Sequence, residues 1–187
     1  GTYPVNEAFR KGIFEVVSIA TTTGFTTADY ASWPTFIPFL LLMSAFIGAC
    51  AGSTGGGIKI IRMLLLYKQG SREIKRLIHP NAVIPIKLGR KPVGSRVIDA
   101  VWGFLAAYVL IFAVLMLVCM ALGEDPITAY SAVGACLNNL GPGLGDATLN
   151  YSTLSDGTKY VLSFAMLLGR LELFTLLVVL SPSFWEH

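Results

Sequence analysis

Long apolar runs alternate along the chain with short segments that are rich in glycine or in charge. The run Val101–Leu122 has no charged residue and is long enough to cross a bilayer as a helix. Two more apolar runs predict membrane helices: Thr35–Ala51, which is somewhat short, and Tyr160–Leu180, which Arg170 and Glu172 interrupt. This pattern predicts an all-α membrane protein.

Two other segments resemble each other, Glu7–Thr27 and Glu124–Gly145. Each begins with an acid, continues as a short helical stretch and ends in polar residues before a glycine, so that Gly24 pairs with Gly141. The helical stretch is too short to cross a bilayer, and an apolar run follows each segment. We therefore predict a repeated unit in which a re-entrant pore helix and loop precede a membrane helix.

The composition agrees with a membrane location, because 54% of the 187 residues are hydrophobic and only 13% are charged. The three cysteines, Cys50, Cys119 and Cys136, match no metal spacing and are interpreted as packing residues. No nucleophile–base set or metal cluster appears, so we expect no enzyme. The N-terminus has no apolar signal region and no initiator Met, which predicts a piece or a processed form of a longer protein.

Charge predicts the orientation of the chain. Ten of the fourteen lysine and arginine residues lie between Lys59 and Arg96, where Glu73 is the only acid. The positive-inside rule places 59–98 in the cytoplasm, and the last apolar run then returns the C-terminus to the same side. We expect three parts: 1–69 with the first pore helix, loop and broken helix, a basic linker 70–98, and a second repeat 99–187.

The opposite ends of the predicted helices carry acids. They are Asp29, Glu124, Asp125, Asp146 and Asp156. Two interpretations stay open: these acids belong to ordinary solvated loops, or they raise the local concentration of cations at an entrance.

Each re-entrant loop places polar side chains directly before its glycine. Backbone carbonyls of such a loop can replace the hydration shell of an alkali cation, and glycine permits the backbone angles that aim them at one axis. Neutral oxygens suit a weakly held monovalent ion, whereas divalent ions usually bring carboxylates. The alternative is a glycine turn between two helices. The candidate K+ filter residues are Thr21, Thr22, Thr23, Gly24, Phe25, Asn138, Asn139, Leu140, Gly141 and Pro142.

The motifs TTTGFTT, GACAGSTGGGIKIIR, LNNLGPGLG and GRLELFTLL together resemble the TrkH-type subunit of the Trk/Ktr/HKT superfamily of potassium transporters. The resemblance covers the whole chain. It implies four helix–pore loop–helix repeats around one pore, arranged like the four subunits of a potassium channel. This chain would be roughly the C-terminal half, beginning just before the third pore helix. The third filter segment would then be Thr22–Phe25 and the fourth Asn139–Pro142.

A glycine-rich stretch interrupts the helix that would follow the first loop. A continuous helix from Thr35 to Tyr67 would span about 50 Å and outrun the membrane. The resemblance implies that the break, about Ala51–Lys59, obstructs the pore and serves as a gate. The alternative is a packing kink with Gly48 and Gly52 as a helix contact. The candidate gate residues are Gly52, Ser53, Thr54, Gly55, Gly56, Gly57 and Arg170.

Arg170 is unusual because a charge near the middle of a membrane helix is costly and is commonly functional. Setting Gly48 against Gly169 brings Arg170 level with the start of the glycine break. We expect its side chain to face the pore, to donate hydrogen bonds to carbonyls of the break and to raise a barrier to cations. The alternative is an arginine held by a carboxylate of another helix. For Glu172 a structural role is expected.

The predicted function is K+ translocation in a bacterial cytoplasmic (inner) membrane, with K+ as the transported ion and no cofactor. The expected partners are the lipid bilayer, a second copy in a homodimer and, from the resemblance, a cytoplasmic nucleotide-binding ring of the TrkA type. Nucleic acid is not expected, because the basic linker has no interleaved aromatic residues. Two other functions stay open: an ion-coupled secondary transporter with broken helices, and a non-conducting structural membrane subunit.

Overall fold

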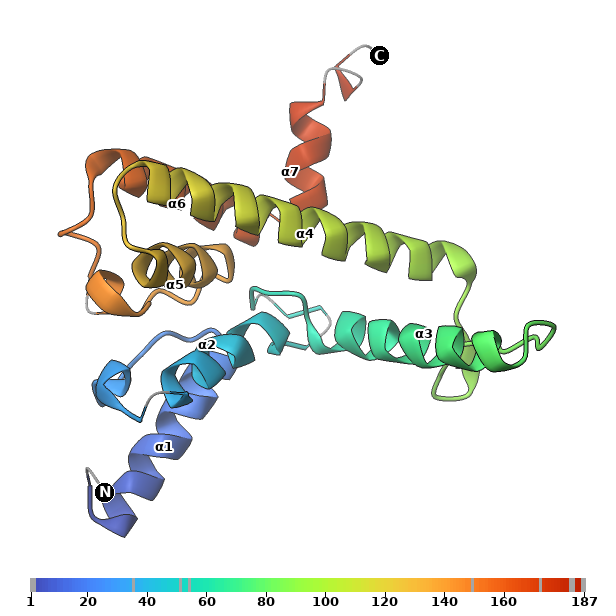
Figure 1. Cartoon of the computed structure of the whole chain (residues 1–187), viewed down its shortest axis with the longest axis horizontal. Coiled ribbons are helices and arrows are strands. Elements are labelled where there is room, and N and C mark those ends of the chain that lie inside the picture. The colour runs from blue at the N-terminus through green and yellow to red at the C-terminus, as the bar shows by residue number, and fades with distance from the viewer. Residues whose placement is uncertain are drawn as a thin grey trace.

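The computed structural model describes residues 3–34, 36–50, 52–53, 55–148, 150–171, 173–181 and 184–185. It is built from helices, and the predicted all-α class is confirmed apart from one hairpin of two short strands (Figure 1). The α-helices are α1 (Val5–Ala20), α2 (Ile37–Ile47), α3 (Ile60–Ile78), α4 (Ser95–Ala121), α5 (Pro126–Leu137), α6 (Asp156–Arg170) and α7 (Leu173–Leu180). The remaining elements are the 3-10 turns η1 (Tyr30–Ser32) and η2 (Gly145–Ala147) and the antiparallel strands β1 (Lys87–Leu88) and β2 (Lys91–Pro92).

The predicted span Val101–Leu122 is confirmed as the core of α4. This helix has 27 residues and, within the described part of the chain, is the one helix long and apolar enough to cross a membrane. It begins earlier than the apolar run, at Ser95, because Arg96 and Asp99 are compatible with a helix that extends beyond the lipid.

The two shorter apolar runs fold differently from the prediction. Within the run Thr35–Ala51 only the 11-residue helix α2 forms, which ends at Ile47, and Gly48 leaves the helical conformation with a ψ of −172°. The run Tyr160–Leu180 is not one helix, because α6 ends at Arg170 and α7 turns away from the axis of α6 (Figure 1). Glu172 and the end positions 35 and 51 lie outside the described residues.

The basic linker 70–98 is more ordered than a loop. Helix α3 continues to Ile78, past the expected boundary at residue 69, and the β1–β2 hairpin precedes α4. Polar contacts one turn apart support this extension, since Gln69 donates to Glu73 at 2.9 Å and Arg76 lies 3.4 Å from the same carboxylate. Helix α3 and the hairpin therefore occupy much of the basic linker.

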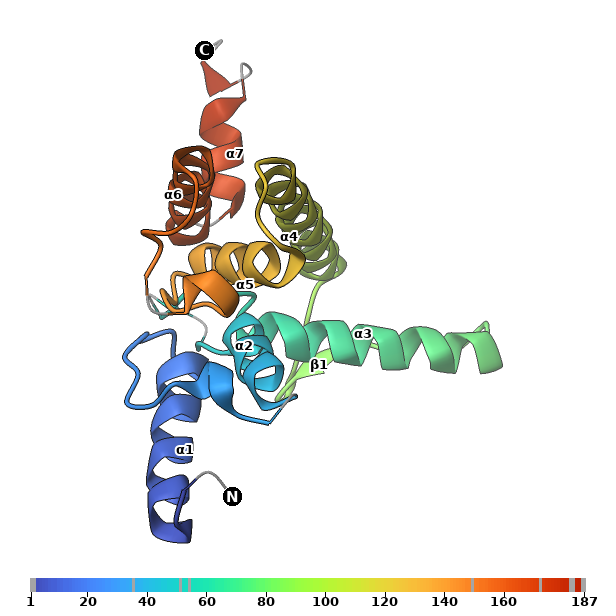
Figure 2. The same cartoon turned by 60° about the vertical axis from the view of Figure 1, so that its left-hand side comes forward.

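Helix α5 is the centre of the molecule, lying between the α1–α2 pair and the α4–α6 pair (Figure 2). Val133 and Leu137 pack with Leu162 and Leu168 of α6 in one apolar cluster. Ala135 packs in a second cluster with residues of α1 and α2. The two clusters join the repeated units through a single buried helix, which carries the second loop at its C-terminal end.

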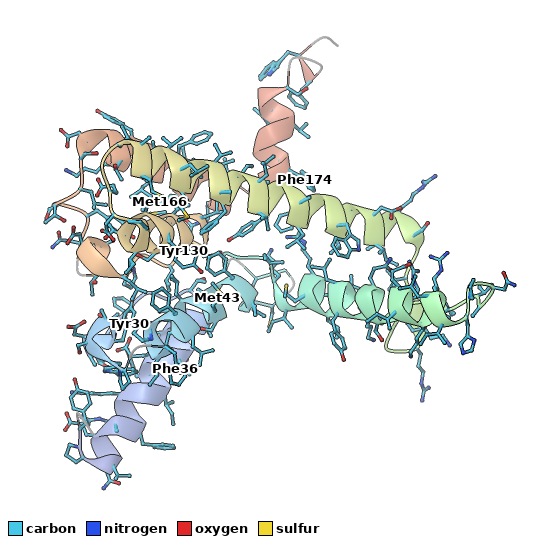
Figure 3. The ribbon with its side chains drawn as sticks, viewed as in Figure 1. Tyr30, Phe36, Met43, Tyr130, Met166 and Phe174 are labelled. Atoms are coloured by element: carbon cyan, nitrogen blue, oxygen red, sulfur yellow. The ribbon has the colours of Figure 1, made fainter. Side chains whose placement is uncertain are left out.

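Two contacts of aromatic side chains join neighbouring helices, one between α5 and α2 and the other between α7 and α4 (Figure 3). The hydroxyl of Tyr130 on α5 lies 3.9 Å from the sulfur of Met43 on α2. Phe174 on α7 packs edge-on against Phe104 of α4, with ring centroids 5.9 Å apart. The second contact holds α7 against α4 even though α7 has left the axis of α6.

Removing the N-cap of α5 should lower the thermal stability of the protein. The Asp125 carboxylate accepts hydrogen bonds from the backbone amides of Ile127 (3.0 Å) and Thr128 (3.1 Å). We expect Asp125→Ala to cost about 1 kcal/mol of unfolding free energy, measured by thermal unfolding in detergent. Asp99→Ala, which removes an exposed acid of α4, is the control.

The same cap predicts a pH dependence. Hydrogen bonds from the Thr128 side chain and backbone lower the pKa of Asp125 from its ordinary value. Its contribution to stability is therefore present above the ordinary pKa and is lost as the pH falls through the lowered one. Equal acid sensitivity of the Asp125→Ala variant and the parent protein would contradict this assignment.

Candidate functional site

The two predicted filter loops have the same backbone shape. Thr22 and Asn139 both have a φ of 54°, and two residues later Gly24 and Gly141 have φ values of 83° and 102°. All four lie in the left-handed region, which glycine adopts freely, Asn tolerates and a β-branched Thr rarely enters. Strained positions of the Thr22 kind concentrate at functional sites.

Matching hydrogen bonds close each loop onto its helix. The amide of Thr23 donates to the carbonyl of Ser18 at 2.8 Å, and the amide of Leu140 donates to the carbonyl of Ala135 at 2.8 Å. These residues correspond when Gly24 is set against Gly141. The folded backbone therefore agrees with the repeat that the residues predict.

The glycines of the two second helices also occupy equivalent places. A Cβ added at Gly48 would lie 1.8 Å from the carbonyl oxygen of Ala20, at the end of α1, and one at Gly169 would lie 2.0 Å from that of Leu137, at the end of α5. Each glycine lets its segment approach the end of the helix that precedes it in the same repeat. The packing interpretation is thus right for Gly48, whereas Gly52 has no described atom within 4 Å of its added Cβ.

The two loops touch each other although they are far apart in sequence. A Cβ added at Gly24 would lie 2.1 Å from the carbonyl oxygen of Leu140. Further out, the hydroxyl of Tyr30 donates to the carbonyl of Gly143 at 2.8 Å. Burial raises the pKa of Tyr30, and the nearby Glu15 raises it further. The hydroxyl therefore keeps the proton that this hydrogen bond needs.

The segment Gly55–Gly57, called the glycine segment below, lies against both loops. The amide of Gly56 donates to the Thr22 hydroxyl at 3.3 Å, and a Cβ added at Gly56 would lie 1.9 Å from the carbonyl oxygen of Asn138. A Cβ at Gly57 would lie 3.3 Å from the Asn138 side-chain oxygen. The segment therefore approaches the residues leading into both glycines more closely than any side chain could.

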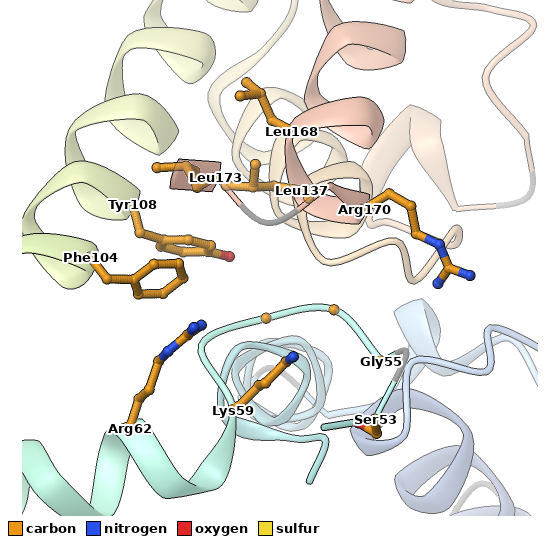
Figure 4. A pocket seen from close by; sticks show the side chains of 13 residues that line it. Ser53, Gly55, Lys59, Arg62, Phe104, Tyr108, Leu137, Leu168, Arg170 and Leu173 are labelled. Carbon is orange, nitrogen blue, oxygen red and sulfur yellow. The ribbon is translucent and has the colours of Figure 1, made fainter. Parts of the chain in front are cut away.

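A cavity of about 200 Å³ opens beside the glycine segment, between it, the middle of α4 and the C-terminal end of α6 (Figure 4). Ser53 and Gly55–Gly57 line it, and the basic side chains of Lys59, Arg62 and Arg170 lie around it from facing elements (Figure 4). The guanidinium of Arg62 stacks over the Phe104 ring, 4.1 Å from its centroid. Arg170 thus shares one cavity with the glycine segment, although it ends a helix rather than standing at the middle of one.

The remaining predicted residues take local roles. The Thr21 hydroxyl lies 2.8 Å from that of Thr23, and Phe25 is an exposed side chain. The carbonyl of Gly141 accepts from the Tyr151 hydroxyl. Pro142 lies beside the first loop, 3.5 Å from the Cβ position of Gly24. Thr54 falls outside the described residues.

Sequence reasoning missed Tyr108. Its hydroxyl lies deep in α4 and donates to the side-chain oxygen of Asn138 at 2.7 Å, next to the second loop. The signal was a polar tip inside an otherwise apolar span, where a buried hydroxyl requires a partner. Lys59 was predicted as the end of the glycine break and as linker charge, and Arg62 only as linker charge, whereas both line the cavity.

The profile of the TrkH family, described as a cation transport protein, matches residues 1–187. The chain belongs to the TrkH family. The family resemblance of the motifs is therefore confirmed, together with the all-α membrane fold.

Individual relatives of this TrkH-family chain are close. The Trk system potassium uptake protein TrkH of Vibrio parahaemolyticus is 58% identical over 180 residues, which cover 96% of this chain and 37% of that protein. The protein of the same name from Escherichia coli K12 is 57% identical over 183 residues, covering 98% and 37%. The crystal structure of the potassium transporter TrkH from Vibrio parahaemolyticus matches with a TM-score of 0.92 and 56% identity, covering 99% of this chain and 40% of that one. The chain thus spans well under half the length of these relatives.

Proposed function

We propose that this TrkH-family chain is part of a membrane-embedded subunit that conducts K+ through a carbonyl-lined filter. The observation that carries the proposal is the meeting of two re-entrant loops of equal backbone shape, with Gly24 of one against Leu140 of the other. Left-handed residues two positions apart, at Thr22 and Gly24 and again at Asn139 and Gly141, suit a loop whose carbonyls face one side, as ion coordination requires. The name of the relatives, Trk system potassium uptake protein, supports K+ as the ion.

The ring of ligands would use the residues leading into each glycine. Thr22, Thr23, Asn138, Asn139 and Leu140 supply neutral backbone oxygens in the two loops. No carboxylate stands in either loop segment, 21–25 or 138–142, which suits a monovalent ion that must also leave. Two further loops from the rest of the subunit would complete the ring.

The glycine segment is proposed as the gate. Its contacts with Thr22 and Asn138 put backbone directly beside the residues through which an ion would leave the filter. Glycine is required there because a Cβ at Gly56 would collide with the Asn138 carbonyl. An obstruction that is held by a few close contacts and contains flexible backbone can be displaced at low cost.

The orientation proposed from charge places 59–98 and the C-terminus in the cytoplasm of a bacterial inner membrane. The name of the relatives supports work with other Trk components. We propose a homodimer and a cytoplasmic nucleotide-binding ring as these partners, with the basic α3 and hairpin region facing the ring.

Ion flux into liposomes tests the proposal, with the protein expressed from its complete reading frame. A conducting filter predicts K+ uptake down the K+ gradient alone, in excess of Na+ uptake. Uptake that requires a second ion gradient would favour the secondary transporter. If a folded protein shows no K+ flux, with or without cytoplasmic partners, the result would favour a non-conducting structural subunit.

Arg170→Ala should raise K+ flux. The side chain lines the cavity beside the glycine segment, so its removal lowers the electrostatic barrier to a cation there. Each kcal/mol removed from the barrier increases the flux by roughly fivefold. Lys159→Ala, which removes a basic residue from the opposite end of α6, is the matched control and should leave the flux unchanged.

The liposome assay that measures K+ uptake decides this prediction. If the Arg170→Ala protein has the parent's thermal stability and the parent's flux, Arg170 does not contribute to the barrier.

A further inference from the structure

Glu15 binds the chain directly after the first proposed filter loop, at Thr27 and Ala28. This glutamate lies on α1, is fully buried, and its Oε1 atom accepts three hydrogen bonds. The donors are the Thr27 amide at 2.6 Å, the Thr27 hydroxyl at 3.1 Å and the Ala28 amide at 3.1 Å. One carboxylate oxygen therefore holds the backbone three residues beyond Gly24 to the helix behind the filter.

A second contact acts in the same direction. The hydroxyl of Ser18, one turn further along α1, donates to the carbonyl of Phe25 at 2.5 Å. After Gly24, the loop is therefore held to its helix by hydrogen bonds with Ser18 and Glu15. Before Gly24, it is held by the hydrogen bond from the Thr23 amide to the Ser18 carbonyl. Gly24 stands between these attachments.

The second repeat holds the equivalent backbone group in a different way. With Gly24 set against Gly141, Leu144 corresponds to Thr27, and its amide donates to the hydroxyl of Ser131 at 2.9 Å. The position that corresponds to Glu15 is Ala132. Both re-entrant helices therefore capture the same backbone amide, one with a carboxylate and the other with a neutral hydroxyl.

The carboxylate is the costlier solution. Its other oxygen, Oε2, is buried and has no hydrogen-bond partner among the described residues. A buried acid with an unpaired oxygen destabilises a fold relative to a small neutral group. The serine of the second repeat accepts one backbone amide of its loop, whereas Glu15 accepts two amides and a hydroxyl, so Glu15 points to a role in positioning the filter loop.

We propose that Glu15 is a positioning residue of the K+ filter. By holding Thr27 and Ala28, it fixes the outer end of the first loop and thereby the spacing of the Thr22–Gly24 carbonyls on which a preference for K+ over Na+ depends. The inference rests on the proposed conduction of K+. It adds a specificity-determining side chain that never touches the ion.

The test compares K+ and Na+ flux in liposomes for Glu15→Ala and Glu15→Gln, in the protein expressed from its complete reading frame. Glu15→Ala removes the acceptor and should lower the K+-over-Na+ flux ratio by about tenfold, the equivalent of one charge-assisted hydrogen bond. Glu15→Gln keeps an acceptor oxygen and should restore most of the ratio. Thr158→Ala, which removes a buried hydroxyl from the start of α6, should lower stability without changing the ratio.

The outcomes separate this inference from the proposed function. A parent protein without K+ flux overturns the proposed function and this inference with it. A conducting parent with a folded Glu15→Ala variant of unchanged ratio overturns the role of Glu15 alone, as does a Gln variant as impaired as Ala. If Glu15→Ala does not fold, Thr27→Val removes one donor to the carboxylate, and an unchanged ratio there overturns the inference.

Discussion

Gly24→Ser is expected to abolish most K+ flux. The residue has a φ of 83°, a conformation that costs an L-residue about 1–3 kcal/mol. The new Cβ would also lie 2.1 Å from the carbonyl oxygen of Leu140, which belongs to the other proposed filter loop. Both loops must then move, so the damage reaches two of the proposed filter segments at once.

Flux measurements in liposomes check this expectation, with K+ and Na+ uptake recorded on the same preparation. We expect K+ flux to fall by at least about tenfold, in line with the strain energy. Gly12→Ala is the matched control, because Gly12 lies in α1 of the same repeat and its added Cβ has no described atom within 4 Å. That substitution should preserve flux and favour the helix.

A folded Gly24→Ser protein with the parent's flux and the parent's ion preference would show that the loop is only a turn. The secondary transporter or the structural subunit would then replace the channel-like function. Loss of the ion preference with retained flux would still support the filter, since it reports a change in the spacing of ligands.

Gly56→Ala is expected to raise K+ flux severalfold. Its Cβ would lie 1.9 Å from the carbonyl oxygen of Asn138, so the glycine segment can no longer rest against the second loop. Gly56 has an ordinary φ, and the collision is therefore the main effect of the substitution. If the segment obstructs the pathway, moving it away opens the pathway without altering the filter.

The ratio of K+ to Na+ flux distinguishes movement of the segment from damage to the filter. An unchanged ratio with higher flux is the expected result. Gly70→Ala is the control, because Gly70 lies in α3 and its added Cβ meets no described atom within 4 Å. Lower flux together with a lower ratio would mean that Asn138 moved instead, and would count against the segment as a gate.

The helices with strong patterns were predictable from the chain. Val101–Leu122 appears as the larger part of α4 with its C-cap, and the two short helices predicted before Gly24 and Gly141 appear as α1 and α5. Their length and apolar character distinguish a span from a re-entrant helix, because bilayer thickness sets the number of residues that a span needs.

The break between α6 and α7 was not predictable in the same way. Arg170 and Glu172 interrupt an apolar run, but the run is long enough for a single helix and contains no proline. What permits the break is packing elsewhere, since Phe174 rests on Phe104 of α4 after the chain has turned. Likewise, α3 passes the expected boundary, where polar and charged side chains one turn apart contact each other along the helix.

The order of segments, the apolar character of the spans and the positions of the glycines follow from residue chemistry, which acts locally along the chain. The contacts of the candidate site do not. Gly24 meets Leu140, Gly56 meets Asn138, and Tyr108 reaches Asn138 only in the folded molecule. Each pair joins residues from different helices or loops, and local patterns carry no information about which distant backbone carbonyl a glycine will approach, because packing of the buried α5 against both helix pairs decides it.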